Sequence, residues 1–249
     1  MNPIDRAALE SAHSSHPEAD LPYYVTFDRF ENPKETTKFI RNILETLADP
    51  ERLYSFADIG CANGEMIYHF RQRFPHWAFH GFDHLEHHIE SAKKHPGLAG
   101  VASFETKDLF DVQGQFDFVG FFGTITIFWD YEDPINKLLS LCKPGGYVLI
   151  DGYFSPDEVE TRTFYMDKSH RPGVWVRDWS LFTRSGLREF LAERASSVEF
   201  YDIPMIEIPR DPSAIHILAR TTKDADGRNR ITNGTQRLLD DTLMVVNKL

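Results

Sequence analysis

The stretch from Phe56 to Met66 constrains this chain most, because it combines a short strand, a turn with glycines and the start of a helix. Residues 54–59 form an apolar run, and a helical pattern begins at Gly64. Gly60 and Gly64 lack a Cβ atom, so they can adopt tight-turn dihedrals and leave room for ligand atoms. The first amides of a helix lack intrahelical partners and can donate to a ligand. The stretch therefore predicts an open α/β sheet that binds a ligand at the carboxyl end of a strand.

The residues of this turn also indicate the kind of ligand. The dinucleotide fingerprint spaces its glycines as G-x-G-x-x-G. Here Gly60, Ala62 and Gly64 alternate, so the last spacing is one residue short. Asp58 precedes the turn and would repel a pyrophosphate, but it suits a ligand that ends in a cationic amine. We therefore expect S-adenosylmethionine as the cofactor, and an NAD-dependent dehydrogenase is an outside alternative.

Two motifs resemble those of a known family. The segment Asp58–Gly64 (DIGCANG) is similar to the first motif of class I S-adenosylmethionine-dependent methyltransferases, although the family usually has glycine at the position of Ala62. Residues 143–146 (KPGG), followed by an apolar strand, resemble the turn before the family's fifth strand, with Cys142 in place of the usual leucine. The resemblance extends over residues 54–152.

The family resemblance implies an α/β fold. It predicts a doubly wound, mostly parallel seven-stranded sheet of the Rossmann-like methyltransferase type, with an N-terminal helical cap and an insert after the fifth strand. The expected organisation is a cap segment at 1–50, a methyltransferase domain at 51–221 with an insert at 153–180, and a C-terminal extension at 222–249.

Three apolar segments near the C-terminus complete the expected fold. We expect residues 198–201 and 215–220 to form the antiparallel hairpin that closes the family's sheet. Residues 243–246 are expected to form an edge strand or an interface segment, which makes a homodimer a candidate assembly.

The cofactor-binding residues follow from strand ends and from the resemblance. Asp83 ends the second expected strand, about twenty positions after Gly64, where an acidic residue suits a ribose diol. The resemblance implies that Asp108 accepts a hydrogen bond from the adenine amino group and that the backbone of Leu109 faces the ring. The predicted cofactor-binding set is Asp58, Gly60, Cys61, Ala62, Gly64, Asp83, His84, Asp108, Leu109, Phe122 and Gly123.

The acceptor site is expected to involve the N-terminal segment and the insert. In the resembling family, residues before the first strand often cover the ligand, and insertions after the fifth strand shape the acceptor pocket. The predicted substrate-binding residues are Tyr23, Tyr24, Trp129, Asp130 and Tyr153. His170 is the candidate catalytic base, because the unperturbed pKa of histidine lies near neutrality.

Two side-chain pairs are candidate metal ligands. His84 and His88 are four residues apart and can share a helix face, but no further ligand completes a recognisable set. Asp130 and Asp151 suit a divalent cation beside a catechol-like acceptor, again without a third ligand. We therefore predict no metal and interpret the histidines as a solvated helix face.

Composition narrows the partners and the compartment. The formal net charge is −11, and no dense run of Lys and Arg occurs, so nucleic acid is not the expected substrate. The sequence shows neither an apolar run long enough for a membrane span nor a secretory signal, which favours the cytoplasm. Cys61 and Cys142, the two cysteines, do not indicate a disulfide framework.

The expected activity is methylation of an oxygen or nitrogen of a small molecule. Methyl transfer from a sulfonium is an in-line displacement, in which orientation supplies most of the effect. A base is needed only where the acceptor is protonated in its ground state. Two alternatives keep the same fold: transfer of another group from a sulfonium, as in aminopropyl transferases, and a non-catalytic module that binds S-adenosylmethionine.

Overall fold

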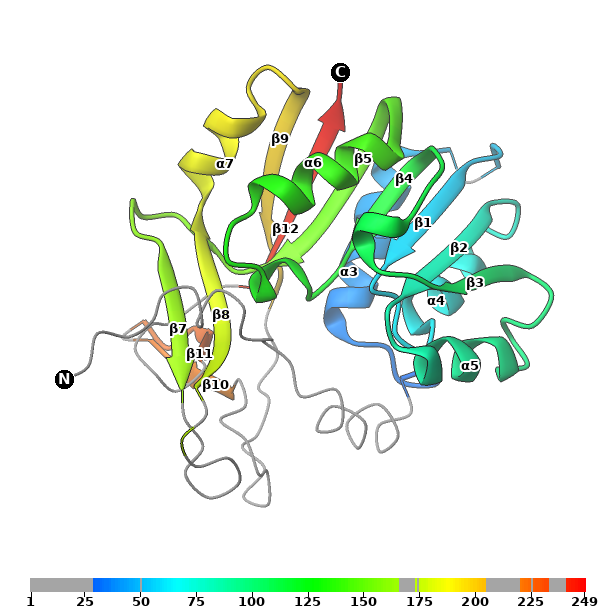
Figure 1. Ribbon diagram of the computed structural model, residues 1–249, viewed down its shortest axis with the longest axis horizontal. Coiled ribbons are helices and arrows are strands. Elements are labelled where there is room, and N and C mark those ends of the chain that lie inside the picture. Colours follow the sequence, from blue (N-terminus) through cyan, green and yellow to red (C-terminus); the bar gives the residue numbers. More distant parts are fainter. Residues whose placement is uncertain are drawn as a thin grey trace.

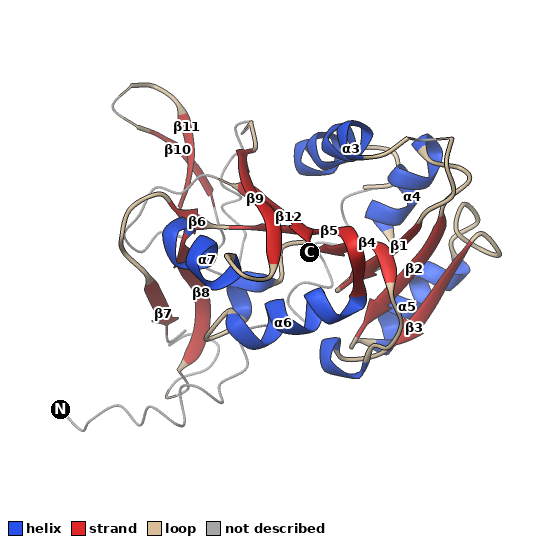
Figure 2. Ribbon diagram, turned by 90° about the horizontal axis from the view of Figure 1, so that it is seen from above, coloured by secondary structure: helices blue, strands red, loops and turns tan. Residues whose placement is uncertain are grey.

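The computed structural model describes residues 29–49, 51–165, 173, 175–204, 220–224, 226–232 and 241–249. At its centre lies a seven-stranded sheet in the order β3-β2-β1-β4-β5-β12-β9, with helices on both faces (Figure 1, Figure 2). The bounds of the strands are Ser55–Ile59 (β1), Ala78–Asp83 (β2), Ala102–Thr106 (β3), Phe116–Phe121 (β4), Cys142–Gly152 (β5), Ala195–Asp202 (β9) and Thr242–Lys248 (β12).

The first five strands run parallel, which confirms the predicted doubly wound architecture. Parallel neighbours require crossover connections, and helical segments supply them. These are α4 (Glu65–Arg73), α5 (Glu86–Lys94), the short 3-10 helices η1 (Leu109–Asp111) and η2 (Ile125–Ile127), and α6 (Glu132–Leu141). Consequently, the carboxyl ends of these strands meet at one edge of the sheet, the lower edge in Figure 1.

Two hydrophobic cores cover the two faces of the sheet. Helix α3 (Glu35–Leu47) packs with α4 and α5 on one face, whereas α6 and α7 (Arg184–Leu191) pack on the other. In α3, Ile40 and Leu44 are fully buried, since a spacing of four residues puts both side chains on one side of the helix. The N-terminal end of α3 lies at the carboxyl edge of the sheet, where Thr36 contacts Asp241.

The strand that closes the sheet differs from the sequence-based expectation. β9 pairs antiparallel with β12 rather than with a strand at 215–220, of which only Arg220 lies within the described residues. β12 also pairs antiparallel with β5, so residues 243–246 occupy the sheet interior and not its edge. The sheet thus takes its sixth strand from the segment expected to be a C-terminal extension. The apolar residues that suggested a homodimer are buried within one chain.

A second, smaller sheet follows β5; it begins within the expected insert at 153–180 and extends three residues beyond it. It consists of β6 (Phe154–Ser155), β8 (Val176–Thr183) and β7 (Thr161–Tyr165), in that order. A separate antiparallel hairpin pairs β10 (Arg220–Lys223) with β11 (Asn229–Thr232). Both lie beside the β12 and β9 half of the main sheet (Figure 1, Figure 2).

The central position of β12 predicts a stability effect. Leu243 is 0% exposed and packs in the core under α3, so Leu243→Ala should lower the free energy of unfolding by about 2–5 kcal/mol. Leu53 is 77% exposed, so Leu53→Ala is the matched control and should change it by less than about 0.5 kcal/mol. Urea denaturation of both variants measures the difference, and similar values for the two would show that β12 is not a core strand.

Candidate functional site

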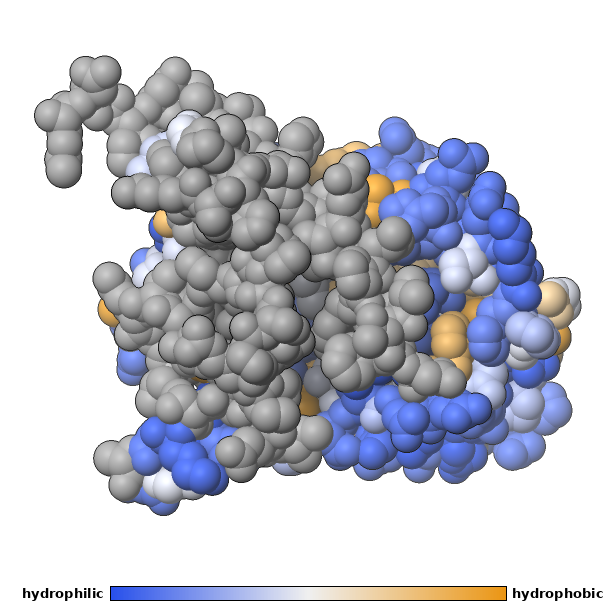
Figure 3. Space-filling model, turned by 90° about the horizontal axis from the view of Figure 1, so that it is seen from below, coloured by the Kyte–Doolittle hydropathy of each residue, from blue (hydrophilic) through white to orange (hydrophobic). Residues whose placement is uncertain are grey.

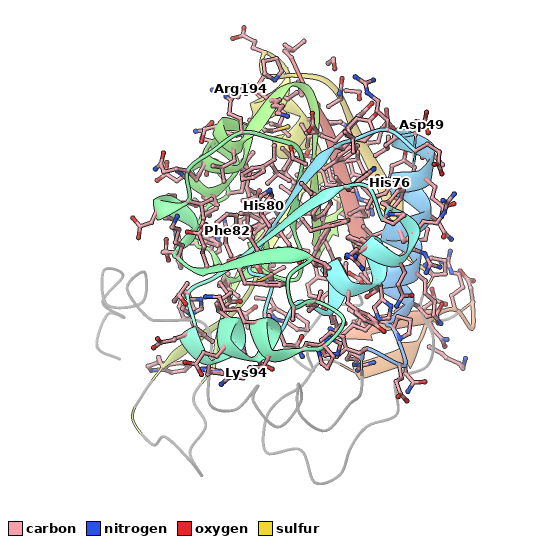
Figure 4. The ribbon with its side chains drawn as sticks, turned by 90° about the vertical axis from the view of Figure 1, so that its right-hand side faces the viewer. Asp49, His76, His80, Phe82, Lys94 and Arg194 are labelled. Carbon is pink, nitrogen blue, oxygen red and sulfur yellow. The ribbon has the colours of Figure 1, made fainter. Side chains whose placement is uncertain are left out.

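The turn after β1 is held against the neighbouring strand. The amides of Gly60 and Cys61 donate to the carbonyl oxygen of Phe82 on β2, at 2.7 and 3.0 Å (Figure 4, in which Phe82 is labelled). Gly60 and Gly64 have φ angles of 76° and 83°, in the left-handed region that favours glycine. A Cβ atom on Gly60 would lie 2.9 Å from Thr124 Oγ1. Backbone conformation and space therefore both require glycine at this position.

Ala62 adopts the same left-handed region without being glycine. Its φ is 46°, a conformation that costs an alanine about 1–2 kcal/mol. Its amide donates to Asp83 Oδ2 at 2.9 Å, a bond that holds the residue in place. The departure from the family's glycine thus leaves the turn formed, but strained at one position.

Asp83 connects this turn to the start of α5. Besides the Ala62 amide, it accepts a hydrogen bond from the Leu85 amide at 2.9 Å, and His88 Nδ1 lies 3.5 Å from Asp83 Oδ1. Burial alone would raise the pKa of Asp83, but the hydrogen bonds from His88, Leu85 and Ala62 outweigh it and lower that pKa. An ionised carboxylate therefore stands at the carboxyl end of β2, with oxygen lone pairs left for a ligand.

Asp58 is the most unusual group of the site. It lies near the end of β1, is 1% exposed, and its Oδ2 atom has no hydrogen-bond partner. Burial, reinforced by the charges of Asp83 and Glu65, raises its pKa from 3.8 to about 8. Glu65 and Asn63 are also buried and have side-chain oxygens without hydrogen-bond partners. Buried acceptors of this kind indicate a ligand that brings donors or positive charge.

The remaining predicted cofactor residues lie along the same edge. Asp108 caps η1 by accepting from the Phe110 amide at 3.0 Å, and Leu109 beside it is buried. His84 is exposed, with Nδ1 3.7 Å from Asp83 Oδ1. Phe122 and Gly123 follow β4, and Gly123 has a φ of 65° with open space around it. Figure 3 shows this face of the molecule, where the described residues around α4 and α5 are mostly hydrophilic.

Three of the predicted acceptor residues, Trp129, Asp130 and Tyr153, lie against the small sheet. The rings of Tyr153 and Trp179 are 4.5 Å apart, and those of Trp129 and Phe164 are 5.8 Å apart. Asp130 is paired with Arg162 at 3.4 Å. Tyr23, Tyr24 and His170 lie outside the described residues, and their predicted roles stay predictions.

Arg162 is a central residue of this region that sequence reasoning did not single out. Its guanidinium donates to the carbonyl oxygen of Trp129, pairs with Asp130 and Glu160, and lies 4.7 Å from the ring centroid of Phe182. It thereby fixes the loop after β4 to the small sheet. The residue stood in the sequence among several basic and aromatic ones, and nothing in its local pattern marked it.

Asp151 and Asp241 form a second group that the sequence did not bring together. The two carboxyl groups lie at the ends of β5 and β12, and the proximity of Asp241 helps to raise the pKa of Asp151. Asp151 was considered only as a metal ligand with Asp130. Among the residues that the structure describes, no set of three or more His, Cys, Asp or Glu side chains is arranged to hold a metal ion.

Comparison with known proteins agrees with this geometry. The seven-stranded, mostly parallel sheet with helices on both faces is shared with methyltransferases of known structure. The family described as a methyltransferase domain matches residues 29–195, more than half of the chain. The chain belongs to this family and is an S-adenosylmethionine-dependent methyltransferase.

Solved structures of several methyltransferases share the fold. The N-methyltransferase NodS from Bradyrhizobium japonicum WM9, in complex with S-adenosyl-L-homocysteine, is 14% identical with a TM-score of 0.52, over 92% of this chain and 96% of NodS. Magnesium protoporphyrin IX methyltransferase from Synechocystis PCC 6803, with bound S-adenosylmethionine, is 13% identical with a TM-score of 0.51, over 93% of this chain and 95% of that chain.

A third structure, the YcgJ protein from Bacillus subtilis, is 13% identical with a TM-score of 0.53, over 85% of this chain and 99% of that chain. At such low identity these similarities show the fold alone. A sequence comparison with curated proteins gives no match. Within the described residues, no helix has both the length and the apolar character needed to cross a membrane.

The pKa of Asp58 predicts a pH-dependent stability. Between pH 3.8 and about 8, folded Asp58 keeps a proton that the unfolded chain releases. The free energy of unfolding should therefore fall as the pH rises through this range, by about 1.4 kcal/mol per pH unit. Asp58→Asn keeps a neutral side chain in both states, so without cofactor it should remove this slope and be more stable than the wild type near the upper limit. Denaturation across the pH range measures both.

Asp117→Asn is the matched control, because the pKa of Asp117 is lowered in the folded protein whereas that of Asp58 is raised. Burial opposes the effect, but hydrogen bonds from Ser55 and Lys143 lower the pKa of Asp117. Its contribution is present above the unfolded pKa and is lost as the pH falls, so this substitution should destabilise the protein at neutral pH. If Asp58→Asn behaved in the same way as Asp117→Asn, burial would not raise the pKa of Asp58 as described above.

Proposed function

We propose that the chain transfers the methyl group of S-adenosylmethionine to an oxygen or nitrogen of a small molecule at the carboxyl edge of the sheet. The observation that carries this proposal is Asp58, a buried carboxyl with an unpartnered oxygen next to a glycine turn. The cofactor brings a sulfonium with an electrophilic methyl group, and its ammonium supplies the donors that this oxygen lacks.

Each part of the cofactor finds a matching group along the edge. Asp58, with Asn63 and Glu65 beside it, suits the amino-acid end. Asp83 suits the ribose diol, because the backbone amides of Ala62 and Leu85 hold its carboxylate in a fixed position. Asp108 and Leu109 suit the adenine amino group and ring, as the family resemblance implies.

On the acceptor side, the chain's own task is to orient the nucleophile and to keep water away. Trp129 and Tyr153 offer partly buried aromatic surface where the loop after β4 meets the small sheet. Asp130 is 63% exposed and already paired with Arg162, so we assign the first contacts to the two aromatic residues. Orientation of this kind supplies much of the rate of an in-line displacement.

An experiment with methyl-labelled S-adenosylmethionine separates methyl transfer from aminopropyl-type transfer and from cofactor binding without turnover. The chain is incubated with methyl-labelled S-adenosylmethionine and a small-molecule extract. Label recovered in a new small molecule, together with S-adenosylhomocysteine, supports methyl transfer. Label recovered in methylthioadenosine would indicate transfer of the aminopropyl type, and cofactor binding without release of label would indicate a binding module.

The role of Asp83 gives a sharper prediction. Asp83→Asn removes the charge and leaves one acceptor oxygen for the two amides and the ribose. The dissociation constant of S-adenosylhomocysteine should therefore rise by about 10- to 100-fold, as expected for a lost hydrogen bond to a charged group. Isothermal titration calorimetry measures the change. Asp226→Asn, on an exposed turn, is the control and should bind like the wild type. Unchanged affinity in Asp83→Asn would remove Asp83 from the cofactor site.

A further inference from the structure

The paired carboxyl groups of Asp151 and Asp241 have a property that the cofactor site does not explain. Asp151 is 8% exposed, lies close to Asp241, and has an oxygen, Oδ1, without a hydrogen-bond partner. Asp241 Oδ2 accepts from Thr36 Oγ1 at 3.0 Å. Burial, followed by the proximity of Asp241, raises the pKa of Asp151 well above its usual range. Asp151 is buried and Asp241 is partly buried, and two close carboxyl groups of this kind do not both ionise readily without a cation.

The register of the sheet places this pair next to the proposed cofactor site. Asp58 pairs with Gly120 on β4, and Gly120 pairs with Leu149 on β5. Asp151 is two residues beyond Leu149, so it lies on the same face as Asp58 and nearer the carboxyl edge. Two strand spacings separate β1 from β5, a distance of about 10 Å.

Asp241 reaches the same face and edge of the sheet from β12, the antiparallel neighbour of β5. Leu243 pairs with Asp151, and Asp241 precedes Leu243 by two residues on the antiparallel strand. It therefore also lies on this face and at this edge. Phe122, two residues after Gly120 and directly after the end of β4, lies between the two groups of carboxyls. The pair thus borders the site from the side opposite Asp58.

Among the described residues, the acids of this region outnumber the cations that act on them. Lys34 acts on Asp151 and lies 3.9 Å from Glu65 Oε1, so one lysine stands between two groups of acids. The ammonium and sulfonium of the cofactor would serve the group around Asp58. They leave the pair at β5 and β12 with an unpartnered oxygen and a negative charge to compensate.

We propose that Asp151 and Asp241 bind the protonated amine of the methyl acceptor, so that the substrate is an amine. This inference rests on the proposed methyl transfer. An alcohol would bring one hydrogen-bond donor and no charge, whereas an ammonium group brings several donors and the missing positive charge. A carboxylate acceptor would be repelled by the pair.

The pair also accounts for the proton that methylation of an amine must release. The bound cation allows both carboxyl groups to be ionised, so the proton of Asp151 leaves to solvent as the ammonium binds. The ammonium then gives one proton to the Asp151 carboxylate and becomes a neutral amine. The nitrogen lone pair then forms the new carbon–nitrogen bond, while the carbon–sulfur bond breaks and its electron pair stays on sulfur. The product is an N-methylammonium ion, and the sulfur leaves as a neutral thioether.

The test uses the full chain saturated with S-adenosylhomocysteine and labelled with ¹³C at the aspartate carboxyl carbons. The probes are benzylammonium and its neutral analogue benzyl alcohol, titrated at millimolar concentrations, and the Asp151→Asn spectrum assigns the Asp151 resonance. We expect benzylammonium to shift the Asp151 and Asp241 resonances and benzyl alcohol to leave them unchanged. Equal responses to the two probes, or no response to either, would overturn the inference.

Variants separate this role from a structural one. Asp151→Asn and Asp241→Asn should each weaken benzylammonium binding by about 10-fold or more and leave the affinity for S-adenosylhomocysteine nearly unchanged. Asp117→Asn, at the opposite edge of the sheet, should leave both affinities unchanged. Thr36→Val removes the hydroxyl bonded to Asp241. If it weakened benzylammonium binding as much as Asp241→Asn, the pair would only fasten α3 to β12.

The cofactor titration in the same samples distinguishes a failure of the proposed methyl transfer from a failure of the amine assignment alone. If S-adenosylhomocysteine fails to bind the wild type, the proposed function fails. If it binds and benzylammonium leaves the two aspartates unaffected, only the amine acceptor is rejected.

Discussion

The hydrogen bond from the Ala62 amide to Asp83 joins the two parts of the chain on which the cofactor site depends. Without it, the turn after β1 would have to hold a left-handed alanine by its own local structure. The same carboxylate also receives the amide at the start of α5, so one side chain fixes a turn and a helix entry together. The position of the strand ends therefore follows from a polar contact, and the hydrophobic cores on the two faces support it.

Several buried carboxyl groups with unsatisfied oxygens gather at the carboxyl edge of the sheet. Asp58, Glu65 and Asp151 are buried carboxyls with oxygens that lack hydrogen-bond partners, an arrangement that a fold without a ligand would avoid. Natural proteins tolerate such groups at functional sites, where a bound molecule compensates them. Asp117 at the opposite edge shows the contrast, because Ser55 and Lys143 satisfy its carboxylate.

The sequence predicts the half of the fold that is built from local units. The strand, turn and helix around Gly60 and the turn at residues 143–146 carry their own signals, since glycine and proline act on the residues next to them. The partner of β9 could not be predicted in this way, because β12 lies about forty residues further along the chain. The Asp151–Asp241 pair escaped notice for the same reason: its members meet only after that distant pairing has formed. Arg162 depends on three separate segments and has no local pattern.

The insertion of β12 between β5 and β9 also has a consequence for biosynthesis. As the polypeptide leaves the ribosome, β1 to β5 can associate in the order in which they appear. β9 and α7, the helix before it, then cannot join the sheet until β12 has been synthesised. During that interval two strand edges and the apolar side of α7 are exposed to other molecules, a situation that favours binding by chaperones or aggregation.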